Sequence, residues 1–292
     1  MNICTAKCLV HYENLWTFEL VYPRYIHSEF MTHRMFSRNA SSSRAIPVSK
    51  VIQQVASNPV VPPKVYMNKA GMVGDVEAPI DVATDFYNLW LDAARNAVET
   101  AKNMEKLGIH KQHVNRILEP FQFIKVIVTS TEWNNFFVLR LAPDAQPEIR
   151  QLASAIYEEM SRCRNKKIGC IEVVERRKHC PDIFACTDED KVNTVVSLPY
   201  ITDEDIAKVG KDNYKDLMTV SAARCARVSY NNHDGSKPNL EKDLELYKHL
   251  YDSRHLSPME HTCIRDVEYH KHANLTGWKS LRYLIETYED LS

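Results

Sequence analysis

The stretch from Pro23 to Pro47, PRYIHSEFMTHRMFSRNASSSRAIP, holds more polar and cationic side chains than a surface loop needs. In it a His33-Arg34 pair is followed by short hydroxyl and amide side chains, and Arg44 ends the run. Arginine forms bidentate, charge-assisted hydrogen bonds with phosphate, while serine hydroxyls and backbone N–H groups fill the remaining acceptor sites. The stretch therefore predicts an anion pocket. A serine-rich turn between a strand and a helix is the alternative interpretation. The short polar residues are Ser37, Asn39, Ser41, Ser42 and Ser43.

The composition is that of a globular protein without general affinity for polyanions. A chain of 292 residues can bury one large core or two small ones, and 44% hydrophobic with 26% charged residues is ordinary usage. The net charge of −1 argues against binding to a nucleic-acid polymer. No apolar run approaches the roughly 18 residues of a membrane helix, and the N-terminal residues lack the regions of a secretory signal. We therefore expect a cytoplasmic protein without a membrane partner.

The eight cysteines do not indicate a metal centre. Four of them lie close together, but six, nine and five residues separate them, and no gap matches a zinc knuckle. We expect reduced thiols, no metal site and a Cys-containing insertion over residues 163–195. The four residues are Cys163, Cys170, Cys180 and Cys186.

Periodicity predicts mostly helix with a few strands. The clearest helix spans Pro79 to Leu107, where small and apolar residues recur every three or four positions in a stripe that we expect to pack in the core. We expect a second long helix from Gln146 to Cys163, and a helix beginning at Pro23 that carries His33 and Arg34. The stripe consists of Val82, Phe86, Leu89, Ala93, Ala97, Ala101 and Met104. Further expected elements are strands Leu15 to Tyr22 and Phe123 to Thr129, a helix from Pro47 to about Ser57, and a hairpin within Lys166 to Asn193.

The residues from Thr32 to Arg44, THRMFSRNASSSR, resemble the signature R-H-R-x-x-S-x-N-E-x-S-x-R-Y of flavin-dependent thymidylate synthases. Six positions match. Three depart from the signature: Thr32 stands where the family has Arg, Ala40 where it has Glu, and Ala45 where it has Tyr. Upstream, Glu29 stands where Gln is usual. The matching residues are His33, Arg34, Ser37, Asn39, Ser42 and Arg44.

Other blocks are similar to motifs of the same family. NFFVLR (135–140) with AQPEIR (145–150) resembles N-F-L-x-L-R…A-Q-x-E-I-R, and RILEP (116–120) resembles the motif before it. ARVSY (226–230) and HLSPMEH (255–261) resemble motifs that in most members precede the signature. The chain therefore resembles a circularly permuted, phage-like arrangement of one catalytic domain over residues 1–292. Permutation is tolerated because domain termini usually lie at the surface.

The resemblance implies an α+β fold in which a small mixed sheet is flanked by long helices, and a homotetramer with active sites between subunits. It implies FAD as cofactor, with methylenetetrahydrofolate and NADPH as co-substrates, and transfer of a one-carbon unit to carbon 5 of dUMP to give dTMP. A flavin- and folate-dependent hydroxymethylase or methylase of dUMP or dCMP is the alternative, motivated by Thr32, Ala40 and Glu29. A non-catalytic nucleotide-binding protein on the same fold is the second alternative.

The resemblance also assigns site residues. Arg140 is implied to polarise the pyrimidine, and Asn135 to lie against the pyrimidine or the flavin; an ion pair of Arg140 with Asp144 or Glu148 is the alternative. For His33 a buried role in the core is the alternative, and for Ser257 and Glu260 a capped turn with an ion pair. The implied cofactor-binding residues are His33, Arg34, Ser37, Asn39, Ser229, His255, Ser257 and Glu260. The implied substrate-binding residues are Glu29, Ser42, Ser43, Arg44, Arg116 and Arg140.

Overall fold

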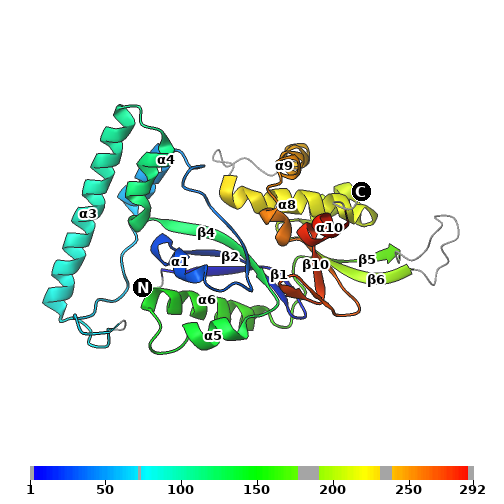
Figure 1. The fold of residues 1–292 in the computed structure, drawn as a ribbon, viewed down its shortest axis with the longest axis horizontal. Coiled ribbons are helices and arrows are strands. Elements are labelled where there is room, and N and C mark those ends of the chain that lie inside the picture. Colours follow the sequence, from blue (N-terminus) through cyan, green and yellow to red (C-terminus); the bar gives the residue numbers. More distant parts are fainter. Residues whose placement is uncertain (1–2, 72–73, 177–190, 231–238, 289–292) are drawn as a thin grey trace.

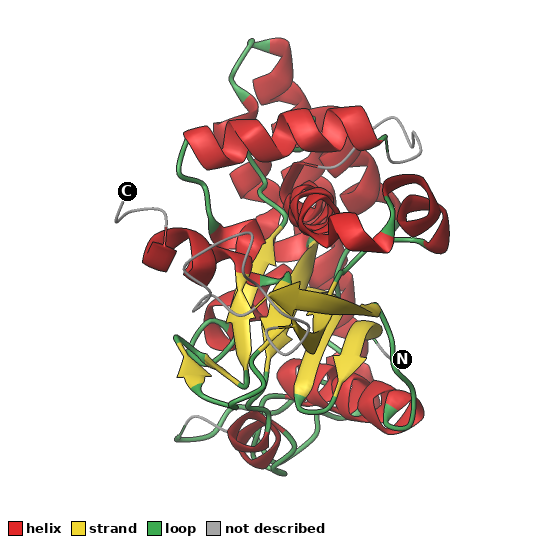
Figure 2. Ribbon diagram, turned by 90° about the vertical axis from the view of Figure 1, so that its right-hand side faces the viewer, coloured by secondary structure: helices red, strands yellow, loops and turns green. Residues whose placement is uncertain are grey.

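A computed structural model describes residues 3–71, 74–176, 191–230 and 239–288 of the chain. These residues form two small four-stranded sheets packed among helices (Figure 1, Figure 2), which confirms the α+β class. The expected single mixed sheet is wrong, since every strand pair in the described residues is antiparallel. None of the helices described is long and apolar enough to cross a bilayer.

The first sheet has the strand order β1-β2-β4-β3. Its central strands β2 and β4 are the two strands predicted from the sequence, and they pair from Trp16 opposite Ser130 to Pro23 opposite Phe123. The edge strands β1 and β3 were not predicted. In β3 the short polar residues of the signature give no alternating apolar pattern. The strands are β1 (Thr5–Tyr12), β2 (Leu15–Pro23), β3 (Ser37–Ala40) and β4 (Phe123–Ser130).

Helices cover both faces of this sheet. On one face lie α5 (Asn134–Arg140) and α6 (Pro147–Cys163), and on the other lies α8 (Tyr214–Tyr230) (Figure 1). The predicted helix of residues 146–163 is thus confirmed, and its apolar stripe packs on the sheet. Ile127 of β4 contacts α8 instead. Because both faces are covered, the central strands are buried almost continuously. The α6 residues in the sheet core are Ile149, Leu152, Ala153 and Ile156.

The second sheet, of order β10-β7-β6-β5, joins the predicted hairpin to the C-terminal part of the chain. Strands β5 (Cys170–Arg176) and β6 (Lys191–Ser197) form that hairpin, while residues 177–190, with Cys180 and Cys186, lie outside the described residues. That the segment is an insertion stays a prediction. The remaining strands are β7 (Cys263–Arg265), β10 (Trp278–Ser280) and a separate pair, β8 (Lys271–His272) and β9 (Leu275–Thr276).

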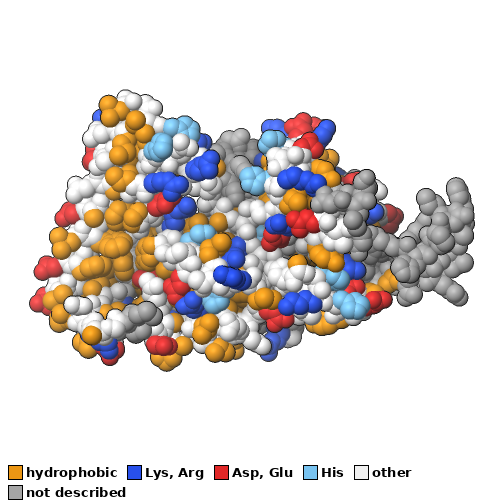
Figure 3. All heavy atoms as spheres, in the orientation of Figure 1, with side chains coloured by type: hydrophobic (Ala, Val, Ile, Leu, Met, Phe, Trp, Pro, Cys, Tyr) orange, Lys and Arg blue, Asp and Glu red, His pale blue; other side chains and the backbone are white. Residues whose placement is uncertain are grey.

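The long helix α3 (Ile80–Lys106) confirms the predicted helix but not its predicted burial. It packs against α2 (Val48–Ser57) and η2 (Asn115–Phe121) from Trp90 onward. Three residues of the expected core stripe are exposed: Leu89 by 70%, Val82 by 39%, and Ala93. Figure 3 shows hydrophobic side chains gathered along this helix. The stripe was misjudged because periodicity shows that one face is apolar without showing what covers it.

The helix expected to begin at Pro23 and to carry His33 and Arg34 is also wrong. The segment forms η1 (Arg24–Ile26) and α1 (His27–Phe30), and it turns before His33. Thr32 ends the helix, since its hydroxyl donates to the Glu29 carbonyl at 2.7 Å. The two residues therefore lie in the turn between α1 and β3, where they face a cleft rather than follow a helix surface.

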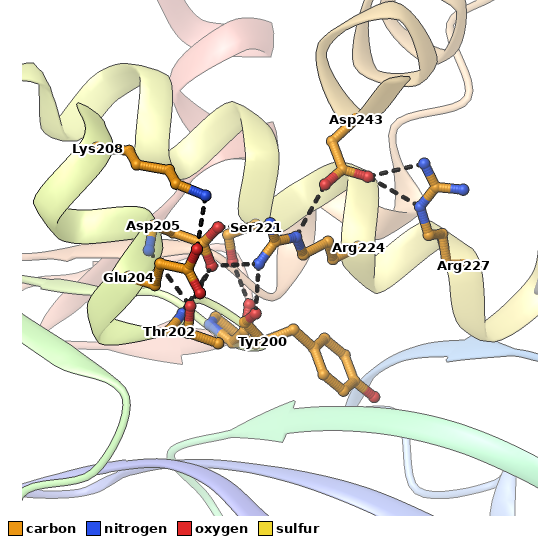
Figure 4. Close-up of polar contacts among 10 residues, drawn as sticks. Tyr200, Thr202, Glu204, Asp205, Lys208, Ser221, Arg224, Arg227 and Asp243 are labelled. Carbon is orange, nitrogen blue, oxygen red and sulfur yellow. Dashed lines mark hydrogen bonds and ion pairs between the residues drawn. The ribbon is translucent and has the colours of Figure 1, made fainter. Parts of the chain in front are cut away.

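A buried ion network holds α8 against the elements beside it (Figure 4). Arg224 donates to Asp205 at 2.6 and 2.9 Å, to Asp243 at 2.9 Å and to the Tyr200 carbonyl at 2.9 Å. Arg227 donates to the same Asp243 at 2.7 Å. The network joins α7 (Asp203–Val209), α8 and α9 (Leu240–Asp252). The other short elements are α4 (Lys111–Val114), η4 (Lys211–Asn213), η5 (Ser257–Glu260) and α10 (Leu281–Tyr288).

Candidate functional site

A cleft of about 440 Å³ opens beside the end of β4, where the chain enters α5. Its walls come from the turn of residues 32–36, from parts of the segment 132–140 and from Lys271 of β8. The described lining includes neither Cys nor Ser. Chemistry in this cleft therefore depends on positioning and on charge rather than on a thiol or serine nucleophile.

Arg140 is held at the cleft by three residues from the opposite wall. Its Nε donates to His33 Nε2 at 2.8 Å, one terminal nitrogen forms an ion pair with Glu29, and the other lies 3.4 Å from the Thr32 hydroxyl. The alternative pairing with Asp144 or Glu148 is not seen, because Glu148 is buried and accepts from the Tyr25 hydroxyl. Arg140 is thus oriented by contacts of its own before any ligand binds.

His33 is buried and neutral, with its Nε2 lone pair facing Arg140. Its ring stands edge to face against Phe136 at 4.9 Å, and only 9% of the residue is exposed. Burial, and then the charges of Arg140 and Arg38, lower the pKa of His33 to about 4. Because Nε2 accepts from Arg140, Nδ1 carries the proton of the neutral ring. His33 is therefore buried, as one alternative foresaw, and it serves as an acceptor that orients Arg140. The flavin contact implied for it stays a prediction.

Acidification should destabilise the protein between about pH 6.5 and pH 4. Burial and nearby arginines lower the pKa of His27 and His33 to about 4, and burial lowers that of His261 to about 3. An unfolded histidine titrates near about 6.5, so in this window the unfolded chain binds more protons than the folded one. The stability is fully present above pH 6.5 and is lost as the pH falls. Melting temperatures across this range measure the slope, which His33→Gln should make shallower; equal slopes would contradict the assignment.

Asn135 and Arg34 also line the cleft, and both are exposed. The ligand contacts implied for them stay predictions. Two further lining residues, Glu132 and Lys271, were missed by the sequence analysis. Lys271 reaches the cleft because its hairpin packs beside the signature segment, a contact that no local pattern encodes. With Arg34, Arg140 and Lys271 against Glu132, the lining has a net positive charge, which suits an anionic ligand.

Ser37 and Asn39 connect the signature strand to the C-terminal part of the chain. The buried Ser37 hydroxyl accepts from Asn274 at 3.0 Å, and the Asn39 amide donates to the Cys225 carbonyl of α8 at 2.9 Å. Neither residue is among those that line the cleft. Their contacts hold β3 in place, and the cofactor contacts implied for them stay predictions.

The residues expected to hold a phosphate lie at the other end of β3. Ser37 pairs with Thr129, whereas Ser41 bonds to Lys125, which is four residues or roughly 13 Å along β4. The chain then turns toward α2, so a serine-rich turn between strand and helix is present as the alternative foresaw. Within one chain, the residues expected to hold a phosphate therefore lie apart from the cleft.

The predicted substrate-binding residues in and beside that turn differ in exposure. The Ser43 hydroxyl is buried and donates to Glu119 at 2.8 Å, and the Ser42 hydroxyl accepts from the backbone of Arg44 at 3.3 Å. Arg44 and Arg116 are exposed, and their segments are joined where the Asn115 amide donates to the Ser43 carbonyl at 2.7 Å. The two arginines thus lie in neighbouring segments on one side of the protein.

The C-terminal motif residues lie near the signature strand but outside the cleft. Short helix η5 and helix α8 both pack against β3. His255 is exposed, Ser257 is half-buried, and Glu260 is ion-paired with Arg282 at 2.7 Å, as its alternative foresaw. The side chain of Ser229 lies outside the described residues. The resemblance thus identified segments that meet in the fold, but the side chains of these motif residues do not line the cleft.

His261 ties this motif to the first sheet. Its Nδ1 lies 2.9 Å from the Thr129 hydroxyl, which in turn lies 2.8 Å from the Thr17 hydroxyl, and all three groups are buried. The sequence analysis quoted His261 within a motif but gave it no role. Its position shows a structural one, since it joins η5 to two strands of the sheet.

Fold and cleft together define an α+β protein with a cationic ligand cleft that offers no thiol or serine nucleophile. Residues 13–163, just over half of the chain, match the family described as thymidylate synthase complementing protein, and the chain belongs to that family. The matched segment includes the signature, β2, β4 and α5. The resemblance stated from the sequence is thereby confirmed.

Individual relatives are more distant. The chain is 26% identical over 164 residues to the flavin-dependent thymidylate synthase of Pyrococcus abyssi, which covers 56% of this chain and 60% of that protein. Among solved structures it is similar to a UMP/dUMP methylase, PolB from Streptomyces cacaoi. With 5-Br UMP bound, the TM-score is 0.43 at 19% identity, over 51% of this chain and 69% of that one. With 5-Br dUMP bound, the TM-score is 0.40 at 20% identity, over 53% of this chain and 68% of that one.

Proposed function

We propose that the protein is a flavin-dependent thymidylate synthase, which transfers a one-carbon unit from methylenetetrahydrofolate to carbon 5 of dUMP and yields dTMP. The observation that carries the proposal is the oriented Arg140 in the cleft of a chain that belongs to the family. The curated relative with a flavin-dependent activity supports it. A methylating enzyme of this class is expected to use FAD as cofactor and NADPH as reductant.

The cleft residues fit a flavin and a pyrimidine by their chemistry. FAD supplies the hydride and mediates the carbon transfer, which is chemistry that no amino-acid side chain provides. The Asn135 amide and the Arg34 guanidinium can donate to ring carbonyls, and Phe136 and Leu139 provide apolar walls. Arg140, held by His33 and Glu29, can stabilise negative charge that develops on a pyrimidine carbonyl. Lys271 adds a third positive charge to the cleft lining.

We also propose that the functional unit is a homotetramer in which one chain completes the site of another. The separation of Arg44 and Arg116 from the cleft within one chain supports this arrangement, because residues of two subunits could then meet at one nucleotide. The exposed apolar face of α3 supports it as well, since a surface of this kind usually marks a protein interface (Figure 3). The apolar residues exposed on α3 are Ile80, Val82 and Leu89.

Absorbance and product mass test the proposed function. The purified protein should show the visible absorbance of bound flavin. With folate and reductant it should convert dUMP to a product heavier by one methylene group. A protein that gains no flavin when supplemented would support a nucleotide-binding role without catalysis. Conversion of dCMP alone, or a hydroxymethyl product, would support the alternative reaction instead.

One observation favours keeping that alternative reaction. Glu29 and Thr32 stand where the family has Gln and Arg, and both contact Arg140. A carboxylate beside the guanidinium changes the charge presented to the pyrimidine, and the missing arginine removes a further positive charge. Hydroxymethylation or methylation of dUMP or dCMP is therefore our second candidate function.

Arg44→Ala should weaken dUMP binding roughly tenfold to a hundredfold while leaving flavin bound. A hydrogen bond to a charged group contributes about 1.5–3 kcal/mol, and Arg44 is exposed, so its loss should not disturb the fold. Equilibrium binding of dUMP to the flavin-loaded protein measures the change. Arg162→Ala, which removes an exposed arginine from α6, is the matched control. Loss of flavin together with dUMP would show that Arg44 holds the cofactor instead.

We further propose that the chain is a circular permutation of the usual family order. The packing of α8 and η5 against the signature strand supports this, because those elements carry the motifs that normally come first. If His255 then contributes to the flavin site of an assembled oligomer, His255→Ala should reduce flavin retention at least about tenfold. Flavin titration of the apoprotein measures it, with His249→Ala as the control on exposed α9. Unchanged retention would remove His255 from the site.

A further inference from the structure

Three potential metal ligands meet in the turn that leads from β7 to β8. Asp266 follows β7 and is buried, while His270 and His272 lie on either side of Lys271. His272 Nε2 lies 2.9 Å from Asp266 Oδ2, and His270 Nδ1 lies 3.3 Å from the same oxygen. A fourth group, Glu268 Oε2, lies 3.5 Å from His270 Nδ1. The ligand atoms of Asp266, His270 and His272 all fall within 4.8 Å of one another.

These separations suit a tetrahedral ion. Zinc binds imidazole nitrogen at about 2.0–2.1 Å, so two ligands of one tetrahedral site lie about 3.3 Å apart. The two imidazoles lie 2.9 and 3.3 Å from Asp266, and His270 lies 3.5 Å from Glu268, so these distances fall near that value. Imidazole and carboxylate are also the ligands that zinc-like transition metals share. Small side-chain rotations would therefore be enough to place an ion between them.

The backbone already holds the turn in the required shape. Asp266 N–H donates to the Gly277 carbonyl at 2.8 Å, and Tyr269 N–H donates back to the Asp266 carbonyl at 3.0 Å. Lys279 lies 3.4 Å from the Oδ1 atom of Asp266, whereas both histidines face Oδ2. The ring of His272 packs against Tyr283 at 4.9 Å, which restrains its orientation. The His270 backbone N–H donates to Oδ2 at 2.9 Å and holds the carboxylate in place, while the two imidazoles approach that same oxygen.

We propose that Asp266, His270 and His272, with Glu268 as the fourth ligand, form a binding site for a divalent transition metal of the zinc class. The ion joins residues on both sides of Lys271, so it fixes the strand that presents this lysine to the cleft. The site lies outside the cleft lining, which includes none of its ligands. Its role is therefore structural, and it is independent of the reaction proposed for the cleft.

Direct metal titration tests the proposal. Full-length protein without a histidine tag is stripped with a chelator, and Zn²⁺ and Co²⁺ are then titrated separately. We expect one equivalent of Zn²⁺ to bind and to raise the melting temperature. We also expect Co²⁺ to give the intense visible bands of a tetrahedral complex. His270→Gln and His272→Gln should each weaken binding at least about a hundredfold, because loss of even an outer-shell partner costs about 10–100-fold.

His270→Gln is the decisive variant, because His270 is exposed and its replacement leaves the buried Asp266 in place. His249→Gln, on the exposed side of α9, is the matched control and should bind Zn²⁺ like the unaltered protein. Two outcomes would overturn the proposal. One is a stripped protein that takes up no stoichiometric Zn²⁺, which would leave the cluster a set of hydrogen bonds. The other is undiminished binding in both His270→Gln and His272→Gln.

Discussion

Replacing Arg140 by lysine should lower turnover at least about tenfold while the melting temperature stays nearly unchanged. The guanidinium uses separate nitrogens to contact His33, Glu29 and Thr32, and this divided contact fixes its plane at the cleft. Lysine keeps the charge and can still pair with Glu29, but it has no planar fork to match two acceptors at once. A loss of about 1.4 kcal/mol of transition-state stabilisation already lowers the rate tenfold.

Steady-state kinetics with saturating dUMP measure this change, and thermal melts of the same samples test the fold. Arg162→Lys makes the same replacement at an exposed position of α6 and should leave both quantities unaltered. If Arg140→Lys retained near-native turnover, Arg140 would serve only as the partner of Glu29. The pyrimidine contact would then pass to Arg34, the other arginine of the cleft lining.

Asp243→Asn should lower the free energy of unfolding by about 3–5 kcal/mol, the usual cost of removing one partner from a buried ion pair. Asp243 is completely buried, and its two oxygens accept from Arg224 at 2.9 Å and from Arg227 at 2.7 Å. Asparagine offers only one acceptor and turns an N–H₂ group toward an arginine. Arg224 keeps Asp205 as a partner, but Arg224 and Arg227 both lose the carboxylate that they share.

Urea unfolding followed by circular dichroism measures this loss. Glu204→Gln is the control, because Glu204 pairs with Lys208 on the exposed side of the neighbouring helix, and such pairs contribute about 0–1 kcal/mol. A loss below about 1 kcal/mol for Asp243→Asn would show that water reaches the network and screens it. The packing of α8 against α9 would then depend mainly on the apolar contacts between the two helices.

The sequence predicted those elements whose burial follows from a local pattern. Strands β2 and β4 and helices α2, α3 and α6 were placed within a few residues, because their apolar residues recur at the period of the element. Prediction from the sequence failed for elements whose structure depends on tertiary contacts. Strand β3 is polar and is held by β4 and α8, and the apolar first half of α3 is left uncovered.

The site was predicted to a similar extent. His33, Arg34, Asn135 and Arg140 were selected by motif order, and the fold brings all four to one cleft. The partnership of Arg140 with Glu29 and His33 had no signal, since the residues lie more than a hundred positions apart. Lys271 and the histidines beside it were missed because they lie in none of the segments that resemble family motifs.

The covering of the first sheet by α8 on one side and α6 on the other has a consequence for biosynthesis. When the family-matched segment 13–163 has been translated, Ile127 still lacks the cover that α8 supplies, and the Thr129 hydroxyl still lacks His261. The ribosome releases the chain from its N-terminus onward, so these groups wait until about a hundred further residues have emerged. Nascent protein therefore carries an open, partly apolar sheet face throughout that interval, which is when chaperones would bind it.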